Sequence, residues 1–134
     1  MIYVDSSVVL AQLLAEDRRP PAGLWAEPLI ASRLLEYEVW CRLHAQGLGP
    51  SHGEQARQLL ARISTIELSP LILARALEPF PLSIRTLDAL HLASLDFLRS
   101  RRQEVSLATY DRRMAQAALA LAIPLHSLPS DARL

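Results

Sequence analysis

The 134-residue chain contains no lysine and no asparagine, so all 14 of its basic residues are arginine. Without lysine there is no P-loop GK[ST] motif and no lysine nucleophile for Schiff-base chemistry. The absence of asparagine excludes N-glycosylation sites. Cys41 is the sole cysteine, which excludes an intrachain disulfide and a zinc site built from several cysteines.

Long hydrophobic runs and a charge excess of either sign are also missing. The apolar runs fall well short of the roughly 20 residues that cross a bilayer. The first residues include an acid at Asp5 and no basic segment, unlike a signal peptide. We therefore expect a cytoplasmic protein with no membrane segment. Because the net charge is 0 at pH 7, any contact with nucleic acid has to come from a local basic patch.

The remaining composition favours one folded domain spanning residues 1–134. Hydrophobic residues make up 51% of the chain and charged residues 21%, which is enough apolar side chain for one core. The apolar patterns predict strands at residues 2–4, 29–31, 64–68, 105–109 and 123–126. Helices are predicted at residues 6–14, 32–44, 51–60, 69–77, 84–99 and 111–121. Such alternation is typical of an α/β domain with a parallel sheet covered on both faces.

Two acidic residues come directly after predicted strands. Asp5 follows the first strand and Asp111 follows the strand at 105–109, and each begins a predicted helix. The carboxyl ends of parallel strands meet at one edge of a sheet, where α/β proteins bind ligands. A purely structural alternative exists for Asp5, since aspartate is also a common N-cap.

Asp88 is a third unusual acid because the pattern of the 84–99 helix places it within the apolar stripe. A partly desolvated carboxylate is costly unless it is paired or bound to a metal. Its structural alternative is a pair with Arg85 or His91. The stripe is formed by Ile84, Leu87, Leu95 and Leu98.

Glu38 has the same character on the 32–44 helix, where its helical neighbours are apolar. A salt bridge to Arg42, four residues later, is its structural alternative. Glu36 offers a competing acid two residues earlier, but helical facing favours Glu38 and leaves Glu36 on the solvated side.

Together these acids indicate a metal centre. Carboxylates gathered at one sheet edge repel one another and raise one another's pKa values. A hard divalent cation such as Mg²⁺ or Mn²⁺ removes that repulsion and prefers oxygen ligands. A cation in such a place supports hydrolysis of phosphodiesters. The four residues are Asp5, Glu38, Asp88 and Asp111.

Four segments carry a family resemblance: MIYVDSSVVL, ASRLLEYEVWCRL, RTLDALHLAS and LATYDRRMAQAA. In order and spacing they resemble the acidic motifs of PIN-domain ribonucleases, and most of all the VapC-type toxins of bacterial toxin–antitoxin pairs. The resemblance implies that Asp5, Glu38, Asp88 and Asp111 are the catalytic and metal-binding residues. Small hydroxyl residues that support the cluster match Ser6 and Thr109. We expect the ring of His91 to orient a neighbouring acid.

The same resemblance implies a three-layer α/β/α PIN-like sandwich with a central, mostly parallel sheet of four to five strands. It implies an endoribonuclease that uses Mg²⁺ or Mn²⁺ and attacks RNA with water rather than with a protein nucleophile. It further implies a homodimer and a VapB-like antitoxin as partner.

Arg112 and Arg113, directly after Asp111, are candidates for RNA phosphate contacts. Solvated residues at a helix end are the structural alternative. Two other functions stay open at this point. The chain can be a non-catalytic PIN-like interaction module, or a PIN nuclease of RNA processing outside a toxin–antitoxin system.

Overall fold

The structure is a computed structural model that describes residues 1–15 and 17–129. Its strands are β1 (Ile2–Val4), β2 (Leu29–Ser32), β3 (Ile63–Ile66) and β4 (Ser106–Ala108). Its helices are α1 (Ser6–Leu13), α2 (Leu34–Ala45), α3 (Gly49–Leu60), α4 (Pro70–Ala76), α5 (Thr86–Ser100) and α6 (Arg112–Ala120). A 3-10 turn, Ala22–Ala26, precedes β2.

All neighbouring strands of the sheet are parallel, in the order β3-β2-β1-β4. The chain moves from β1 outward through β2 to β3 and then returns to add β4 on the other side of β1. The strand order therefore reverses between β1 and β4. Open α/β sheets bind ligands outside the carboxyl ends of the strands at such a reversal.

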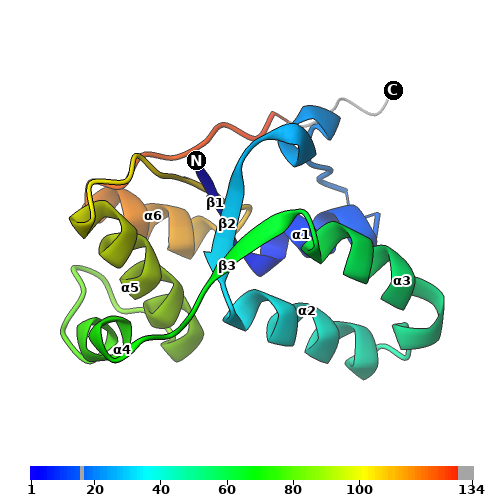
Figure 1. Ribbon diagram of the computed structural model, residues 1–134, viewed down its shortest axis with the longest axis horizontal. Coiled ribbons are helices and arrows are strands. Elements are labelled where there is room, and N and C mark those ends of the chain that lie inside the picture. Colours follow the sequence, from blue (N-terminus) through cyan, green and yellow to red (C-terminus); the bar gives the residue numbers. More distant parts are fainter. Residues whose placement is uncertain (16, 130–134) are drawn as a thin grey trace.

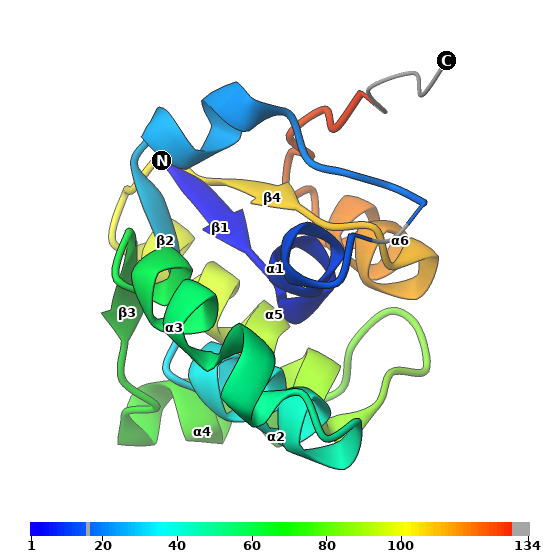
Figure 2. The ribbon, with the colours of Figure 1, turned by 90° about the vertical axis from the view of Figure 1, so that its right-hand side faces the viewer.

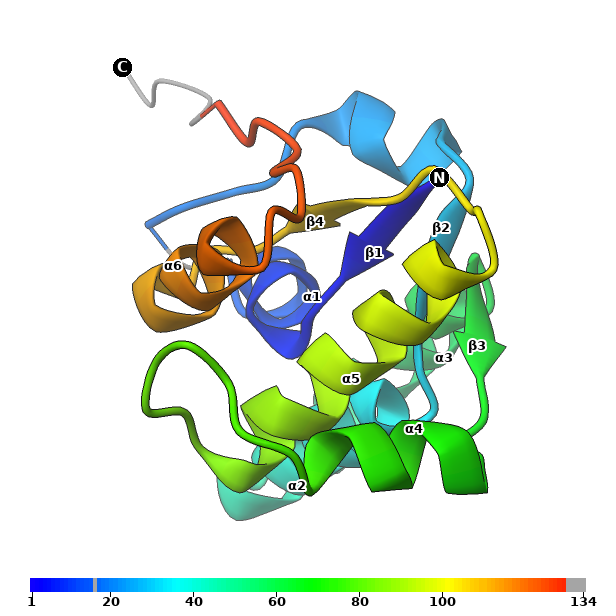
Figure 3. The same cartoon turned by 90° about the vertical axis from the view of Figure 1, so that its left-hand side faces the viewer.

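Helices cover both faces of the sheet, as Figure 1 shows with α1, α2 and α3 on one side and α4, α5 and α6 on the other. The alternation of side chains along a strand explains the two cores. Ile2 and Val4 pack in one core with side chains of α1, α2 and α3, the helices that face the viewer in Figure 2. Tyr3 between them packs in the other core with side chains of α5 and α6, which lie on the face shown in Figure 3. This three-layer arrangement confirms the α/β/α prediction.

Capping side chains fix where several helices begin. Before α4, the Ser69 hydroxyl accepts a hydrogen bond of 3.4 Å from the backbone N–H of Ile72, and Pro70 occupies the first helical position. Proline is favoured there because its missing N–H would have no partner in the helix. Asp5 and Asp111 are the N-caps of α1 and α6. Two of the suspected catalytic acids therefore also define helix starts.

The strand predicted at residues 123–126 is wrong. Among the described residues, this segment contributes only an isolated parallel bridge between Leu107 and Leu125. Pro124, which has no N–H to donate, interrupts the run, so a full ladder cannot form. The sheet accordingly has four strands.

The predicted apolar stripe of α5 also needs correction. Leu87 is 46% exposed, and Ile84 precedes the helix, which begins at Thr86. The buried apolar side chains of α5 that pack in the core with Tyr3 are Leu92, Leu95 and Leu98. Asp88 consequently lies at the rim of the core and not within it. In the described part of the chain, no helix has the length and apolar character needed to cross a membrane.

Candidate active site

Asp5 lies at the carboxyl end of β1 and is 5% exposed. Its Oδ1 accepts hydrogen bonds from the backbone N–H of Ser7 at 3.1 Å and from the Ser7 hydroxyl at 2.5 Å. Its Oδ2 accepts a hydrogen bond of 2.5 Å from the Thr109 hydroxyl, at the end of β4. Asp5 is therefore the N-cap of α1 and also a link between two adjacent strand ends.

Burial raises the pKa of Asp5 to about 6. Desolvation is the main cause, because a buried carboxyl group loses the water that stabilises its charge. The hydrogen bonds from Ser7 and Thr109 and the nearby His91 oppose the rise, while the charge of Asp111 adds to it. Asp5 and Asp111 thus lie close enough to repel each other.

The hydroxyl groups of Ser7 and Thr109 tie the two strand ends together. The Ser7 hydroxyl donates to Asp5 and accepts from the backbone N–H of Tyr110 at 2.9 Å. The Thr109 hydroxyl donates to Asp5 and accepts from the backbone N–H of Asp111 at 2.9 Å. Thr109 was expected to support the acids, whereas Ser7 was missed. Its signal was available, since a residue two positions after an N-cap aspartate is within reach of that carboxylate.

Glu38 approaches the site from α2. Its Oε1 lies 2.5 Å from His91 Nε2, and its Oε2 accepts a hydrogen bond of 3.5 Å from the Ser6 hydroxyl. Ser6 therefore contacts Glu38 and not Asp5. Glu36 instead accepts from Arg33 at 3.4 Å, away from these groups. Within the described residues no ion pair joins Glu38 to Arg42, so the salt-bridge alternative does not apply.

His91 is 1% exposed and connects Glu38 to the core. Its Nδ1 lies 2.6 Å from the Tyr3 hydroxyl, whose oxygen also accepts from the backbone N–H of Ser32 at 3.1 Å. Burial raises the pKa of Tyr3 well above its usual range, so the phenol stays protonated. Sequence reasoning missed Tyr3, although a tyrosine inside a buried strand needs a partner for its hydroxyl.

Asp88 lies in the first turn of α5 and is half-buried. Desolvation is the largest cause of its raised pKa, and the charges of Asp111 and Glu38 raise it further. His91 and Arg85 lower this pKa, but neither forms a salt bridge with Asp88 among the described residues. The structural alternative, a pair with Arg85 or His91, therefore does not form among the described residues, and the charges of Asp111 and Glu38 act on Asp88 instead.

Asp111 caps α6, and its Oδ1 accepts from the backbone N–H groups of Arg113 at 2.9 Å and Met114 at 3.3 Å. The second oxygen of this half-buried carboxylate has no hydrogen bond within the described part of the chain. Arg112 and Arg113 are both exposed. Four different helices therefore bring the predicted acids into one region, through the starts of α1, α5 and α6 and one face of α2. These acids are Asp5, Glu38, Asp88 and Asp111.

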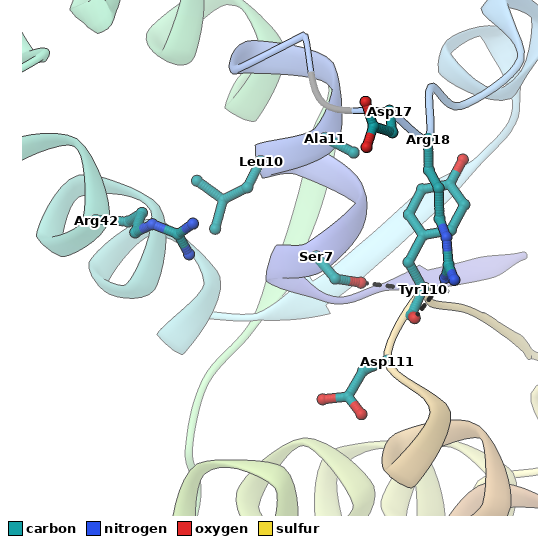
Figure 4. A pocket seen from close by; sticks show the side chains of 8 residues that line it. All are labelled: Ser7, Leu10, Ala11, Asp17, Arg18, Arg42, Tyr110 and Asp111. Atoms are coloured by element: carbon teal, nitrogen blue, oxygen red, sulfur yellow. Dashed lines mark hydrogen bonds between the residues drawn. The ribbon is translucent and has the colours of Figure 1, made fainter. Parts of the chain in front are cut away.

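A groove of about 650 Å³ opens beside Asp111, between α1 and α2 (Figure 4). We call it the arginine groove, because Arg18 and Arg42 form opposite sides of it. Leu10 and Ala11 of α1 lie between them. The sequence indicated neither arginine as a binding residue, and Arg42 was considered only as a salt-bridge partner of Glu38, since the proximity of the two arginines depends on how α1 and α2 pack.

The chemistry of the acids fits a hard divalent cation, because all are oxygen donors and neighbouring negative charges help to raise the pKa values of Asp5 and Asp88. Their arrangement is open. In residues 1–15 and 17–129, no three histidine, cysteine, aspartate or glutamate side chains are close enough to hold a metal ion as they stand. Glu38 faces His91, and Asp5 is surrounded by hydroxyl groups.

The family model of the PIN domain matches residues 2–120. The chain belongs to the PIN domain family. Ribonuclease VapC35 of Mycobacterium tuberculosis strain H37Rv is 30% identical, over 99% of this chain and 100% of that protein. Ribonuclease VapC47 of the strain CDC 1551 is 29% identical, over 85% of this chain and 87% of its own. The resemblance to VapC ribonucleases is thereby confirmed.

The PIN fold is also shared with a solved structure. VapC20 of Mycobacterium tuberculosis, described as a toxin that cleaves the sarcin–ricin loop, matches with a TM-score of 0.67 and 18% sequence identity. The match covers 96% of this chain and 100% of that one. At this identity the likeness shows the three-layer fold.

Proposed function

We propose that this PIN domain is a metal-dependent endoribonuclease acting as the toxin of a VapBC-type pair. One observation carries the proposal: at the strand-order reversal, burial raises the pKa values of Asp5 and Asp88, the charge of Asp111 raises both further, and that of Glu38 adds to the rise at Asp88. Such an arrangement costs folding free energy, because each charge disfavours the others. The names of the VapC relatives support a ribonuclease activity.

Asp5 and Asp88 are the proposed principal ligands of Mg²⁺ or Mn²⁺, and Glu38 and Asp111 complete the site or orient the attacking water. A divalent ion bound there supplies positive charge to the reacting phosphate and lowers the pKa of water. The protein's own contribution is positioning. His91 holds one oxygen of Glu38, leaving the other near Ser6, and the helix start of α6 leaves one oxygen of Asp111 unbound.

The proposed partners are an RNA substrate, a VapB-like antitoxin and a second copy of the chain. The VapC relatives support the first two. Exposed leucines on and after α4 support a protein interface, because large apolar side chains in water mark interaction surfaces. These residues include Leu71 at 63% exposed, Leu73 at 44% and Leu77 at 89%.

The test is cleavage of total cellular RNA by the purified protein in Mg²⁺, in Mn²⁺ and in EDTA. We expect discrete fragments with either metal and none in EDTA. Asp88→Asn should reduce the rate at least about 100-fold, since a metal centre supplies several kcal/mol of transition-state stabilisation. Asp96→Asn, on the same helix but paired with Arg75, is the matched control and should retain cleavage.

Two outcomes contradict the proposal. Cleavage that persists in both EDTA and Asp88→Asn would point to a contaminating nuclease or to metal-free chemistry. Intact RNA under every condition, including RNA from several bacterial sources, would favour a non-catalytic PIN module.

A further inference from the structure

The arginine groove begins at the acidic site. Asp111 and Ser7 are common to both, and from them the groove runs along α1 between Arg42 on one side and Arg18 on the other (Figure 4). Its volume of about 650 Å³ lies within the range of roughly 300–1,000 Å³ that is usual for small-ligand sites. An RNA strand that is cleaved at the carboxylates has to extend from the acidic site along the protein surface, and this groove adjoins that site.

Arg18 is held in place by uncharged partners. Its Nη1 donates a hydrogen bond of 3.1 Å to the backbone carbonyl of Tyr110, and its guanidinium lies 5.8 Å from the centre of the Tyr110 ring. Neither partner is an anion. A guanidinium has five N–H donors in a fixed plane, so most of them remain available to a phosphate.

Arg42 is equally available, for a reason that lies in α2. Four residues earlier on the helix, Glu38 contacts His91 and Ser6, so the salt bridge to Arg42 that helical spacing allows does not form. Arg42 has no salt bridge to any described residue, and its guanidinium points toward Leu10 across the groove (Figure 4).

Between the two arginines Leu10 and Ala11, which are 7% and 1% exposed, form the floor of the groove, and the half-buried Tyr110 lies beside Arg18. Phosphates need donors, whereas bases and riboses need apolar or stacking contacts. An A-form duplex keeps its bases stacked and its deep major groove closed to side chains, so only an unstacked strand can place a base on the groove floor or beside Tyr110.

We propose that the arginine groove binds single-stranded RNA next to the cut, with Arg18 and Arg42 contacting phosphates on its two sides. This inference rests on the proposed ribonuclease function and names where the substrate lies. Asp17, which also lines the groove beside Arg18, makes its surface mixed in charge. Phosphates are therefore expected at the two arginines and not along the whole groove.

The test measures binding apart from cleavage. A fluorescein-labelled single-stranded RNA 12-mer of mixed sequence is titrated with full-length protein in EDTA, and fluorescence polarisation is followed over a range of salt concentrations. We expect Arg18→Gln and Arg42→Gln each to weaken binding about 3- to 10-fold at low salt. Each should also reduce the slope of log affinity against log salt by about 0.7, the value for one phosphate contact on a single strand.

Two variants separate charge at the groove from charge elsewhere. Arg62→Gln changes an exposed arginine directly before β3, at the amino edge of the sheet, and should leave affinity and salt slope unchanged. Arg42→Lys keeps the charge and should retain the slope. Unchanged circular dichroism shows that each variant is folded.

The proposal is overturned if the Arg18→Gln/Arg42→Gln double variant binds like the wild type, if Arg62→Gln loses as much, or if the wild type does not bind the 12-mer. Equal competition by a duplex of the same length overturns the single-strand assignment. The ribonuclease function is tested separately, by the loss of RNA cleavage in Asp88→Asn. Binding of the 12-mer and cleavage of RNA are measured independently, so either proposal can fail while the other stands.

Discussion

The acidic site has two sides that are built differently. On the held side, Asp5 and Glu38 each contact side chains from other elements, and Asp5 is 5% exposed. On the open side, Asp88 and Asp111 are half-buried. The Asp111 side chain accepts hydrogen bonds only from the first turn of its own helix, and the Asp88 side chain has no hydrogen bond to any described residue.

The difference separates two needs of a hydrolytic site. Precise catalysis requires some groups whose positions are fixed by surrounding contacts. Other groups have to keep their oxygen atoms available to whatever enters. The held side pays for fixed geometry with the desolvation of charge, and the open side keeps half-buried carboxylates with oxygen atoms that have no hydrogen bond among the described residues. Substitutions on the two sides should therefore differ in their effect on stability.

The largest effect on stability is expected at the centre of the held side. His91→Ala removes a buried ring together with the hydrogen bonds that it forms with the Tyr3 hydroxyl and with Oε1 of Glu38. We expect a loss of about 3 kcal/mol in the free energy of unfolding, from the cavity and from the unsatisfied polar groups. Urea unfolding followed by the fluorescence of Trp25 and Trp40 measures it.

Tyr3→Phe is the matched control because it keeps the ring in the core and deletes only the hydroxyl group. It should cost about 1–2 kcal/mol, since the backbone N–H of Ser32 and the Nδ1 of His91 each lose a hydrogen bond. If His91→Ala lowered the free energy of unfolding no more than Tyr3→Phe does, the contact between Glu38 and His91 would not stabilise the fold. The description of this side as held in place would then be wrong.

A second effect on the held side depends on pH. The pKa of Asp5 rises from 3.8 to about 6 on folding. Between these pH values the folded protein binds more protons at this group than the unfolded chain does, so stability falls as pH rises. Below pH 3.8 the penalty is absent, and above about pH 6 it is complete.

Asp5→Asn removes that penalty. In EDTA at pH 7.5 the variant should be more stable than the wild type by about 2 kcal/mol, and at pH 4 the two should be nearly equal. Unfolding in urea at both pH values checks this, and Asp17→Asn, an exposed acid, is the control. Equal stability of Asp5→Asn and wild type at pH 7.5 would mean that the hydrogen bonds from Ser7 and Thr109 fully offset burial.

The fold was largely predictable because each apolar run is followed by a helix with a recognisable start. The starts of α4 and α6 were predicted from Ser69-Pro70 and from Asp111, and the structure has Ser69 and Asp111 as the N-caps of these helices. The final strand failed because an apolar run at residues 123–126 outweighed the signal of Pro124. The predicted apolar stripe assumed a helix that begins at Ile84. The helix begins at Thr86, and Leu87 in its first turn is exposed.

The acids could be found because each stands in an unfavourable place, after a strand or among apolar residues. Their supporting residues could not be found in the same way. Tyr3 and Ser7 act through contacts that span 88 and 102 residues, to His91 and Thr109 respectively. Helical spacing offered Arg42 only as a salt-bridge partner of Glu38, whereas tertiary packing places that acid against His91.

The smallest effect is expected on the open side, where Asp111 stabilises the fold only by capping α6. Asp111→Ala should cost about 1 kcal/mol, since it leaves the first backbone N–H groups of the helix without an acceptor. Asp111→Asn retains a capping oxygen and should stay within about 0.5 kcal/mol of the wild type. Thermal unfolding in EDTA compares the two variants.

The pair of variants also decides what the open side contributes. If Asp111→Asn keeps the stability but loses the cleavage of RNA, the charge of Asp111 serves chemistry and its geometry serves the fold. If Asp111→Asn destabilises as much as Asp111→Ala, the charge itself supports α6 through the helix dipole. Asp111 would then be as fixed as Asp5, and the division of the site into a held and an open side would no longer describe it.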